Sequence, residues 1–307
     1  MKEMFRLAQL VFLAACLASH VFVANALAGP FGEFVVFGDS LSDNGNLLLV
    51  DDQPDPDPEV YWRGRLSNGP VWVEYLTDAS HFNTNLTDRA LGGAQTDGLV
   101  PPGLIEQVRA HILLAGPPLS RTNLYVIWIG GNDFFNGDGD FLKAVSNIDE
   151  AIEMLADNGA MSLLVVNLPD LGAVTSEANS AEAPAATAFT VNFNRELANR
   201  IDAFSVSHPD IQIYEFDIEA LFERVRNDPG AFGFTNATDP SPNFGVPNNF
   251  DSAGYLFWDD IHPTTEMHAI IADAVYADLN AQIPTTAHET PAQADESASC
   301  FITVMMP

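Results

Sequence analysis

The sequence feature that most constrains the fold is a series of short apolar runs, each of which stops abruptly at glycine or proline. Runs of this kind without a helical period predict buried strands that enter tight turns. The three clearest runs are residues 34–37, 123–129 and 161–168, which are followed by Gly38, Gly130 and Pro169. A fourth segment, residues 211–216, alternates apolar and polar residues and predicts an edge or half-buried strand.

Between these runs lie segments whose apolar residues recur every three or four positions, the spacing of one helix face. They are residues 104–114, 147–156, 189–204 and 264–279, and a further short helix is expected to begin at Pro70. Strands that alternate with such helices predict a mostly parallel sheet covered on both faces, a three-layer α/β/α fold. No repeat and no linker divides the 307 residues, so we expect a single domain over residues 29–280.

Two stretches rich in turn residues interrupt this pattern. Residues 51–59 are rich in proline and aspartate and predict a surface loop. Residues 228–251 are rich in glycine, proline, asparagine and aspartate and predict one long loop beside the functional site. We expect the loops at 51–66 and 229–258 to build the pocket that selects the ligand.

The beginning of the chain resembles a signal peptide. Lys2 and Arg6 precede a mostly apolar stretch, and small residues up to Ala28 offer a cleavage site. Residues 1–28 therefore predict a secreted or periplasmic protein. The alternatives are an uncleaved membrane anchor, or a lipoprotein anchored at Cys16 in a lipobox-like Leu-Ala-Ala-Cys segment.

Once such a signal is removed, Cys300 is the only cysteine, which excludes an internal disulfide. Residues 281–307 are expected to form a disordered tail, and the apolar segment at 301–306 is too short to span a bilayer. We therefore expect no stable membrane insertion after cleavage. The sequence leaves the oligomeric state open.

The charge of the chain limits its partners. The formal net charge is −30, from 12 Lys and Arg against 42 Asp and Glu. Such a surface repels nucleic acid and anionic lipid and keeps the protein in solution. Without a basic patch that could follow a phosphate backbone, no nucleic-acid partner is expected.

Ser40 comes directly after the first predicted strand, within Phe-Gly-Asp-Ser-Leu-Ser-Asp-Asn-Gly-Asn (residues 37–46). In an α/β sheet, ligands bind at the carboxyl ends of the strands, so a nucleophile would be well placed there. The alternative is that Ser40 merely caps the following helix, helped by Asp39 and Ser42.

A serine hydroxyl becomes a good nucleophile only when a base accepts its proton and a third group orients that base. The best candidates lie in Trp-Asp-Asp-Ile-His-Pro, residues 258–263. The proline after His262 disfavours helical geometry and predicts a loop before the last helix. There His262 can face Ser40 while Asp259 folds back onto its ring, with Asp260 as the alternative partner.

Four sequence blocks, in this order, resemble the GDSL family of lipases and esterases, also called SGNH hydrolases. They are residues 37–46, Leu-Gly-Gly-Ala-Gln-Thr at 91–96, Gly-Gly-Asn-Asp at 130–133 and Asp-Asp-Ile-His-Pro at 259–263. The resemblance spans residues 33–280. The long first block and the segment at 67–75 are similar to the branch that holds secreted bacterial phospholipase/haemolysin-like proteins and plant GDSL lipases.

The resemblance implies the flavodoxin-like SGNH hydrolase fold. It also implies that Ser40 is the nucleophile, His262 the general base and Asp259 the residue that holds the tautomer of His262. Neither a metal nor an organic cofactor is implied.

The same resemblance implies an oxyanion hole. Its donors would be the backbone N–H groups of Ser40 and Gly93 and the side-chain amide of Asn132, with Gly92 as a one-residue alternative to Gly93. The chain departs from the branch at Gln95, where threonine or arginine is frequent. Its acidity is greater than expected for an enzyme that works on anionic membranes, which disfavours a phospholipid substrate.

These observations predict a secreted serine hydrolase that cleaves carboxylic esters of small molecules or lipids through an acyl-enzyme. One alternative is an acyltransferase, which would use the same residues and differ only in how water is excluded. The other is a non-catalytic binding or adhesion protein on the same scaffold. The acyl chain length and the alcohol of the substrate are not encoded in any motif.

Overall fold

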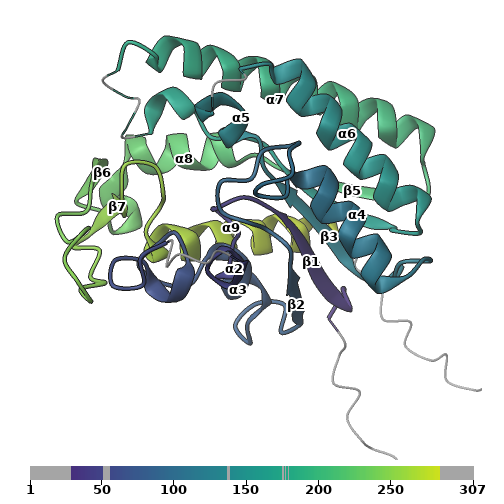
Figure 1. Cartoon of the computed structure of the whole chain (residues 1–307), viewed down its shortest axis with the longest axis horizontal. Helices are drawn as coiled ribbons and strands as arrows, with labels where there is room; N and C mark the ends of the chain where they lie inside the picture. The colour runs from purple at the N-terminus through teal and green to yellow at the C-terminus, as the bar shows by residue number, and fades with distance from the viewer. Residues whose placement is uncertain are drawn as a thin grey trace, which may run out of the picture.

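A five-stranded, wholly parallel sheet lies at the centre of the computed structural model, with strand order β2-β1-β3-β4-β5 (Figure 1). The strands are β1 (Glu33–Gly38), β2 (Asn85–Asp88), β3 (Leu124–Trp128), β4 (Ser162–Val166) and β5 (Gln212–Phe216). The structure describes residues 29–50, 56–136, 139–174, 176, 178 and 180–283. The predicted parallel sheet is confirmed, and β5 is an edge strand as its alternating pattern indicates.

Helices cover both faces of this sheet, as Figure 1 shows. One face carries α4 (Leu104–Ala115), α6 (Phe141–Asp157) and α7 (Ala183–Ser207), and the other carries α3 (Trp72–Thr77), α8 (Ile218–Asn227) and α9 (Thr265–Gln282). The shorter elements are α2 (Asn46–Val50), α5 (Gly131–Phe135), the 3-10 turns η1 (Trp62–Gly64), η2 (Leu171–Ala173) and η3 (Pro229–Phe232), and the paired strands β6 (Asn236–Pro240) and β7 (Tyr255–Phe257). This is the expected three-layer α/β/α architecture in one domain.

Two hydrophobic cores fill the spaces between the layers. Successive side chains of β1 point to opposite faces, so Val35 and Phe37 join the core under α4, α6 and α7. Phe34 and Val36 join the core under α3, α8 and α9. A strand that is buried on both faces must be apolar throughout, which is why the run at 34–37 shows no alternation.

The four longer predicted helices are confirmed, and their ends are set by local chemistry. Helix α6 begins before its apolar repeat because the Asp140 side chain accepts hydrogen bonds from the backbone N–H groups of Leu142 (3.1 Å) and Lys143 (3.2 Å). The predicted start at Pro70 is wrong. Helix α3 begins at Trp72, after the N-cap residue Val71, whose backbone N–H donates to the Glu74 carboxylate at 3.0 Å.

Residues 228–251 are not one long loop, because they contain η3 and β6, and β6 pairs with β7. The expected tail at 281–307 starts too early, since α9 continues to Gln282. The predicted signal peptide at 1–28, the remainder of the tail at 284–307 and part of the predicted loop, residues 51–55, lie outside the described residues.

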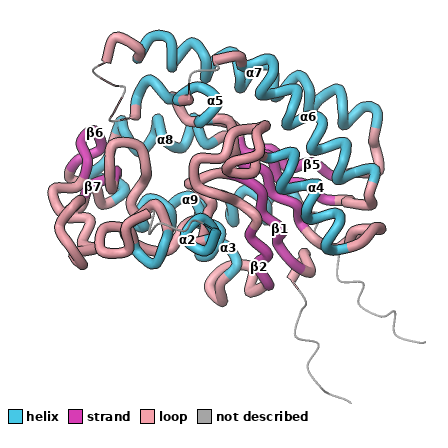
Figure 2. The backbone as a smooth tube through the Cα atoms, viewed as in Figure 1, coloured by secondary structure: helices cyan, strands magenta, loops and turns pink. Residues whose placement is uncertain are grey.

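The strand order creates a natural ligand site. The chain leaves β1 toward β2 and later crosses to β3 on the other side, so the connections diverge between β1 and β3. A crevice at the carboxyl ends of two such strands is where α/β sheets bind ligands. Figure 2 shows long loops gathered beside the sheet, on the side where β6 and β7 lie. In the part of the chain that the structure describes, no helix is both long and apolar enough to cross a membrane.

Candidate active site

Ser40 lies in the turn after β1 and is held there by tight packing. Gly38 pairs with Trp128 of β3, and a Cβ atom at Gly38 would come within 2.5 Å of the Trp128 carbonyl oxygen. Gln107 of α4 fixes the same glycine, because its side chain accepts the Gly38 N–H and donates to the Gly38 carbonyl, each at 2.9 Å. The turn that follows is therefore placed rigidly, and it leaves Ser40 at the wall of a pocket.

His262 and Asp259 come from the loop between β7 and α9 and meet Ser40 as expected. The His262 Nε2 atom lies 2.9 Å from the Ser40 Oγ atom, and its Nδ1 atom lies 2.7 Å from Asp259 Oδ2. The loop is closed by a hydrogen bond from the Trp258 N–H to the His262 carbonyl (2.8 Å). Ser40 and the distant pair His262 and Asp259 thus form one continuous chain of hydrogen bonds.

Asp259, rather than Asp260, is the partner of His262. The second oxygen of Asp259, Oδ1, accepts the backbone N–H groups of Ile261 (2.8 Å) and His262 (2.6 Å), so the carboxylate folds back over its own turn. Asp260 is exposed, and its carbonyl accepts the N–H of Ser176 at 2.8 Å. The carboxylate three residues before His262 is therefore the one that closes this turn.

The two glycines after β2 differ in what their backbone can do. The Gly92 N–H donates to Asp43 Oδ2 at 2.8 Å, so this donor is already engaged. Gly93 lines the pocket in a left-handed conformation (φ 76°), which favours glycine. Asn132, in the first turn of α5, also lines the pocket, and its Nδ2 atom donates to the Ala94 carbonyl at 2.9 Å. One of the two Nδ2 hydrogens is used in that bond.

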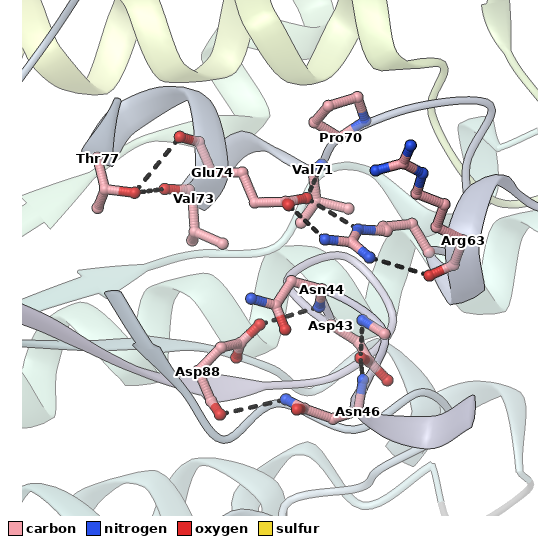
Figure 3. A network of polar contacts seen from close by, with 12 residues as sticks. Asp43, Asn44, Asn46, Arg63, Pro70, Val71, Val73, Glu74, Thr77 and Asp88 are labelled. Atoms are coloured by element: carbon pink, nitrogen blue, oxygen red, sulfur yellow. Dashed lines mark hydrogen bonds and ion pairs between the residues drawn. The ribbon is translucent and has the colours of Figure 1, made fainter. Parts of the chain in front are cut away.

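Asp43 joins the loops around this site through its carboxylate, and Figure 3 shows the part of this polar network near Asn44, Asn46 and Asp88. Its Oδ1 atom accepts the N–H groups of Gly45 (2.8 Å) and Asn46 (2.5 Å), and its Oδ2 atom accepts those of Leu47 (3.1 Å) and Gly92. A buried carboxylate that gathers four backbone donors fixes the first and second sequence blocks relative to each other.

A second carboxyl in Figure 3 continues this network. Asp88, at the end of β2, accepts the Asn44 N–H at 2.9 Å, and its carbonyl accepts the Asn46 side chain at 3.2 Å. Arg65 pairs with Glu74 of α3 and donates to the Arg63 carbonyl. Burial raises the pKa of Asp88 well above its usual value, with the charge of Asp43 adding to the effect.

The electrostatics of the site suit proton transfer. Burial opposes ionisation of Asp259, but the charge and hydrogen bonds of His262, together with the Tyr61 hydroxyl, outweigh it and lower the pKa of Asp259 to about 2. Burial likewise disfavours a charged His262, yet the Asp259 carboxylate raises the pKa of His262 above its usual value. His268, fully buried in α9, has its pKa lowered to about 3 by burial and by His262.

The sequence matches the family model of the GDSL-like lipase/acylhydrolase over residues 34–275, which is most of the chain. The chain belongs to the GDSL-like lipase/acylhydrolase family.

Individual relatives agree with this assignment. The chain is 28% identical to the thermolabile hemolysin of Vibrio parahaemolyticus over 268 residues, which cover 80% of this chain and 63% of the hemolysin. It is 25% identical to the phosphatidylcholine-sterol acyltransferase of Aeromonas hydrophila, with 84% of this chain and 93% of that protein covered. This chain therefore spans less than two thirds of the hemolysin but nearly all of the acyltransferase.

A solved structure described as a GDSL-like lipase, from Parabacteroides merdae ATCC 43184, has the same fold. Its TM-score is 0.50 at 11% sequence identity, and the match covers 82% of this chain and 97% of that one. At this identity the likeness concerns the fold alone.

The GDSL-like chain has a pocket of about 750 Å³ in front of Ser40. Its walls are mainly apolar, and the only charged or titratable side chains among its described lining residues are Asp39 and His262. Of the described residues in the loops at 51–66 and 229–258, only Leu66 and Phe257 line this pocket, so the expectation that these loops build it is largely wrong for the part of them that the structure describes. The walls come instead from the segments after the strands: 92–93, 99–102, 131–135, 168–174 and 261–263.

Sequence reasoning also missed two polar residues that support the GDSL-like site. Gln107 lies on the buried face of α4. A glutamine on the apolar face of a helix indicates a buried polar contact, so the sequence could have identified it. The Tyr61 hydroxyl donates to Asp259 Oδ2 at 2.7 Å. No pattern in the sequence around Tyr61 predicts this contact, which joins residues 198 positions apart. In the described residues, no three histidine, cysteine or acidic side chains gather as metal ligands would.

Proposed function

We propose that this protein is a serine hydrolase that cleaves carboxylic esters through an acyl-enzyme. The observation that carries the proposal is the chain of hydrogen bonds from Ser40 through His262 to Asp259 at the wall of the pocket. His262 would accept the proton of Ser40 Oγ as that oxygen attacks the ester carbonyl. Asp259 would hold the proton on Nδ1 and stabilise the imidazolium that forms.

The tetrahedral intermediate would then place its negative oxygen against three donors. We assign these to the backbone N–H groups of Ser40 and Gly93 and to the remaining Nδ2 hydrogen of Asn132. Gly93 is favoured over Gly92 because the Gly92 N–H already donates to Asp43. The intermediate collapses when His262 protonates the departing alcohol, which leaves the acyl group on Ser40. A water molecule then attacks this ester and gives a proton to His262, which returns it to Ser40 Oγ as the carboxylic acid departs.

The pocket supports an uncharged ester with an apolar acyl or alcohol group. Its apolar walls would exclude water from a hydrocarbon chain, and no lysine or arginine among the described lining residues would offset the charge of an anionic substrate. The signal-like residues 1–28 support a secreted or periplasmic site of action.

The decisive experiment is hydrolysis of p-nitrophenyl esters, from acetate to palmitate, by the purified chain and by its Ser40→Ala variant. Ester cleavage that disappears in Ser40→Ala is the expected result. Activity that persists in the variant would remove Ser40 from the reaction, and an inert wild-type chain would favour a binding protein on this scaffold.

A second candidate is acyl transfer, which the similarity to an acyltransferase along 93% of that relative's length favours. The same acyl-enzyme would form, and an alcohol in place of water would attack it. Adding an acceptor alcohol to the assay and measuring the new ester against the free acid separates the two outcomes.

A further inference from the structure

Tyr61 contacts the group that orients the proposed general base. Its hydroxyl donates to Asp259 Oδ2 at 2.7 Å, and the same oxygen lies 2.7 Å from His262 Nδ1. The other carboxylate oxygen is held by two backbone N–H groups of its own loop. Among the described residues, Tyr61 is therefore the one side chain outside this loop that donates a hydrogen bond to the Asp259 carboxylate.

The position of Tyr61 is itself fixed by contacts with the segment that leads to Asp259. Its ring packs edge-on against Phe244, with the centroids 5.7 Å apart, and Phe244 packs in the same way against Trp258 at 5.9 Å. The Trp258 indole N–H donates back to the Val60 carbonyl at 3.2 Å.

Two backbone hydrogen bonds complete this connection. The Asn248 N–H donates to the Glu59 carbonyl at 2.6 Å, and the Tyr61 N–H donates to the Asp57 carbonyl at 2.8 Å. Residues 57–61 are thus held by their own turn and by Asn248, and they contact the segment that carries Asp259 through Val60 and Tyr61. These contacts restrict the movement of Tyr61, so they keep its hydroxyl within hydrogen-bond distance of Asp259.

We propose that Tyr61 is a positioning residue of the active site, whose hydroxyl holds the Asp259 carboxylate in the orientation that aligns the His262 ring with Ser40. This inference rests on the proposed function. It assigns no bond-making step to Tyr61, because its oxygen contacts the carboxylate and not the reacting atoms.

The hydrogen bond also tunes the base. A donor on Asp259 Oδ2 draws off part of the negative charge that faces His262, so it weakens the pull of the carboxylate on the ring proton. The other titratable groups that act on His262 are Asp39, at the end of β1, and His268, in α9. Both would remain in a variant that lacks only the Tyr61 hydroxyl.

Tyr61→Phe tests the proposal, because it removes the hydroxyl and keeps the ring that packs on Phe244. We expect kcat for a short neutral ester to fall about tenfold, the typical loss for a hydrogen bond to a charged group, with little change in KM. With more of the Asp259 charge acting on it, His262 should stay protonated to higher pH. The acid limb of the profile of kcat/KM against pH should therefore move upward by a few tenths of a unit.

Tyr125→Phe is the matched control. Its hydroxyl likewise donates a hydrogen bond, to the Ser120 carbonyl at 3.1 Å, but it lies at the amino end of β3, and Tyr125 is not among the described residues that line the pocket. This variant should keep the wild-type kcat and acid limb. Titration of active sites from the acyl-enzyme burst, together with thermal melts, refers each kcat to folded enzyme only.

A Tyr61→Phe enzyme with the wild-type kcat and acid limb would overturn the role of Tyr61. The same conclusion would follow if the variant had fewer titratable active sites but each remaining site had the wild-type kcat and acid limb. The proposed function would stand in both cases, provided that Ser40→Ala is inactive. If Ser40→Ala retains activity, the proposed function fails first.

Discussion

Asp39 is the carboxyl closest in sequence to the proposed nucleophile, and it is almost completely buried. Its Oδ1 atom accepts the Leu41 N–H at 3.1 Å, and the side chain forms part of the pocket wall. Burial raises the pKa of Asp39 from 3.8 to about 7, the negative charge of Asp133 adds to the rise, and His262 opposes it. The turn that presents Ser40 therefore contains a carboxyl that the fold prefers to keep protonated.

This preference predicts that Asp39→Asn stabilises the protein at alkaline pH. Between pH 3.8 and about 7 the folded state binds more protons than the unfolded state, so the free energy of unfolding falls as pH rises through this window. The asparagine, which can still accept the Leu41 N–H, removes that loss. From pH 5 to pH 8 the variant should gain roughly 2–3 kcal/mol over wild type, at 1.36 kcal/mol per pKa unit.

Urea unfolding of both proteins at pH 5, 6.5 and 8 measures this difference. A variant whose stability relative to wild type does not rise with pH would show that Asp39 is ionised in the folded state.

The pKa of Asp259 is shifted in the opposite direction, so its effect on stability depends on pH with the opposite sign. Its pKa of about 2 means that its contribution to stability is present above pH 3.8 and is lost as the pH falls toward 2.

At the scale of elements, the sequence predicts those helices and strands whose apolar residues recur with a regular period or form an unbroken run. The strands β1, β3, β4 and β5 and the helices α4, α6, α7 and α9 all follow from such patterns. Strand β2 does not, because Asn85–Asp88 contains a single apolar residue, Leu86, and pairs only along one edge of β1. Strands β6 and β7 are short and lie among turn residues, so their pairing depends on tertiary contacts.

The same division holds for the site. The predicted site residues Ser40 and Asn132 and the glycines follow strands or lie in turns near them. Asp259 lies at the spacing that closes a turn on His262. Because these are local features, the sequence could predict that the residues lie close together. Tyr61 and the apolar walls of the pocket could not. Their positions depend on how loops distant in the sequence pack together, and no local pattern records that packing.

Asn132 shows how two such elements cooperate, and it yields a prediction. Its side chain joins the first turn of α5 to the loop after β2 through the Ala94 carbonyl, which aims the amide into the pocket. Asn132→Ala should fold normally and lose about a hundredfold in kcat, the typical effect of removing one oxyanion donor. Steady-state kinetics beside a thermal melt distinguish lost turnover from lost folding. A folded variant with wild-type turnover would exclude Asn132 from the oxyanion hole.

At the scale of the whole molecule, the dominant property is the net charge of −30. A field of this size lowers the local concentration of anions, and no lysine or arginine among the described lining residues of the pocket offsets this effect. The pocket and the surface therefore favour the same kind of substrate. An uncharged ester meets neither barrier, whereas an ester that carries a carboxylate meets both.

This combination predicts a salt-dependent choice between two esters of similar size, p-nitrophenyl butyrate and the mono-p-nitrophenyl ester of succinate. In 10 mM NaCl we expect kcat/KM for the anionic ester to be at least about tenfold lower than for the neutral one. In 0.5 M NaCl the long-range part of this difference should disappear, because the Debye length falls from about 30 Å to below 8 Å. What remains measures the pocket alone, since salt does not screen the desolvation of a carboxylate against apolar walls. The neutral ester is the internal control and should change little with salt. An anionic ester that is cleaved as fast as the neutral one at low salt would contradict both the electrostatic argument and the assignment of an uncharged substrate.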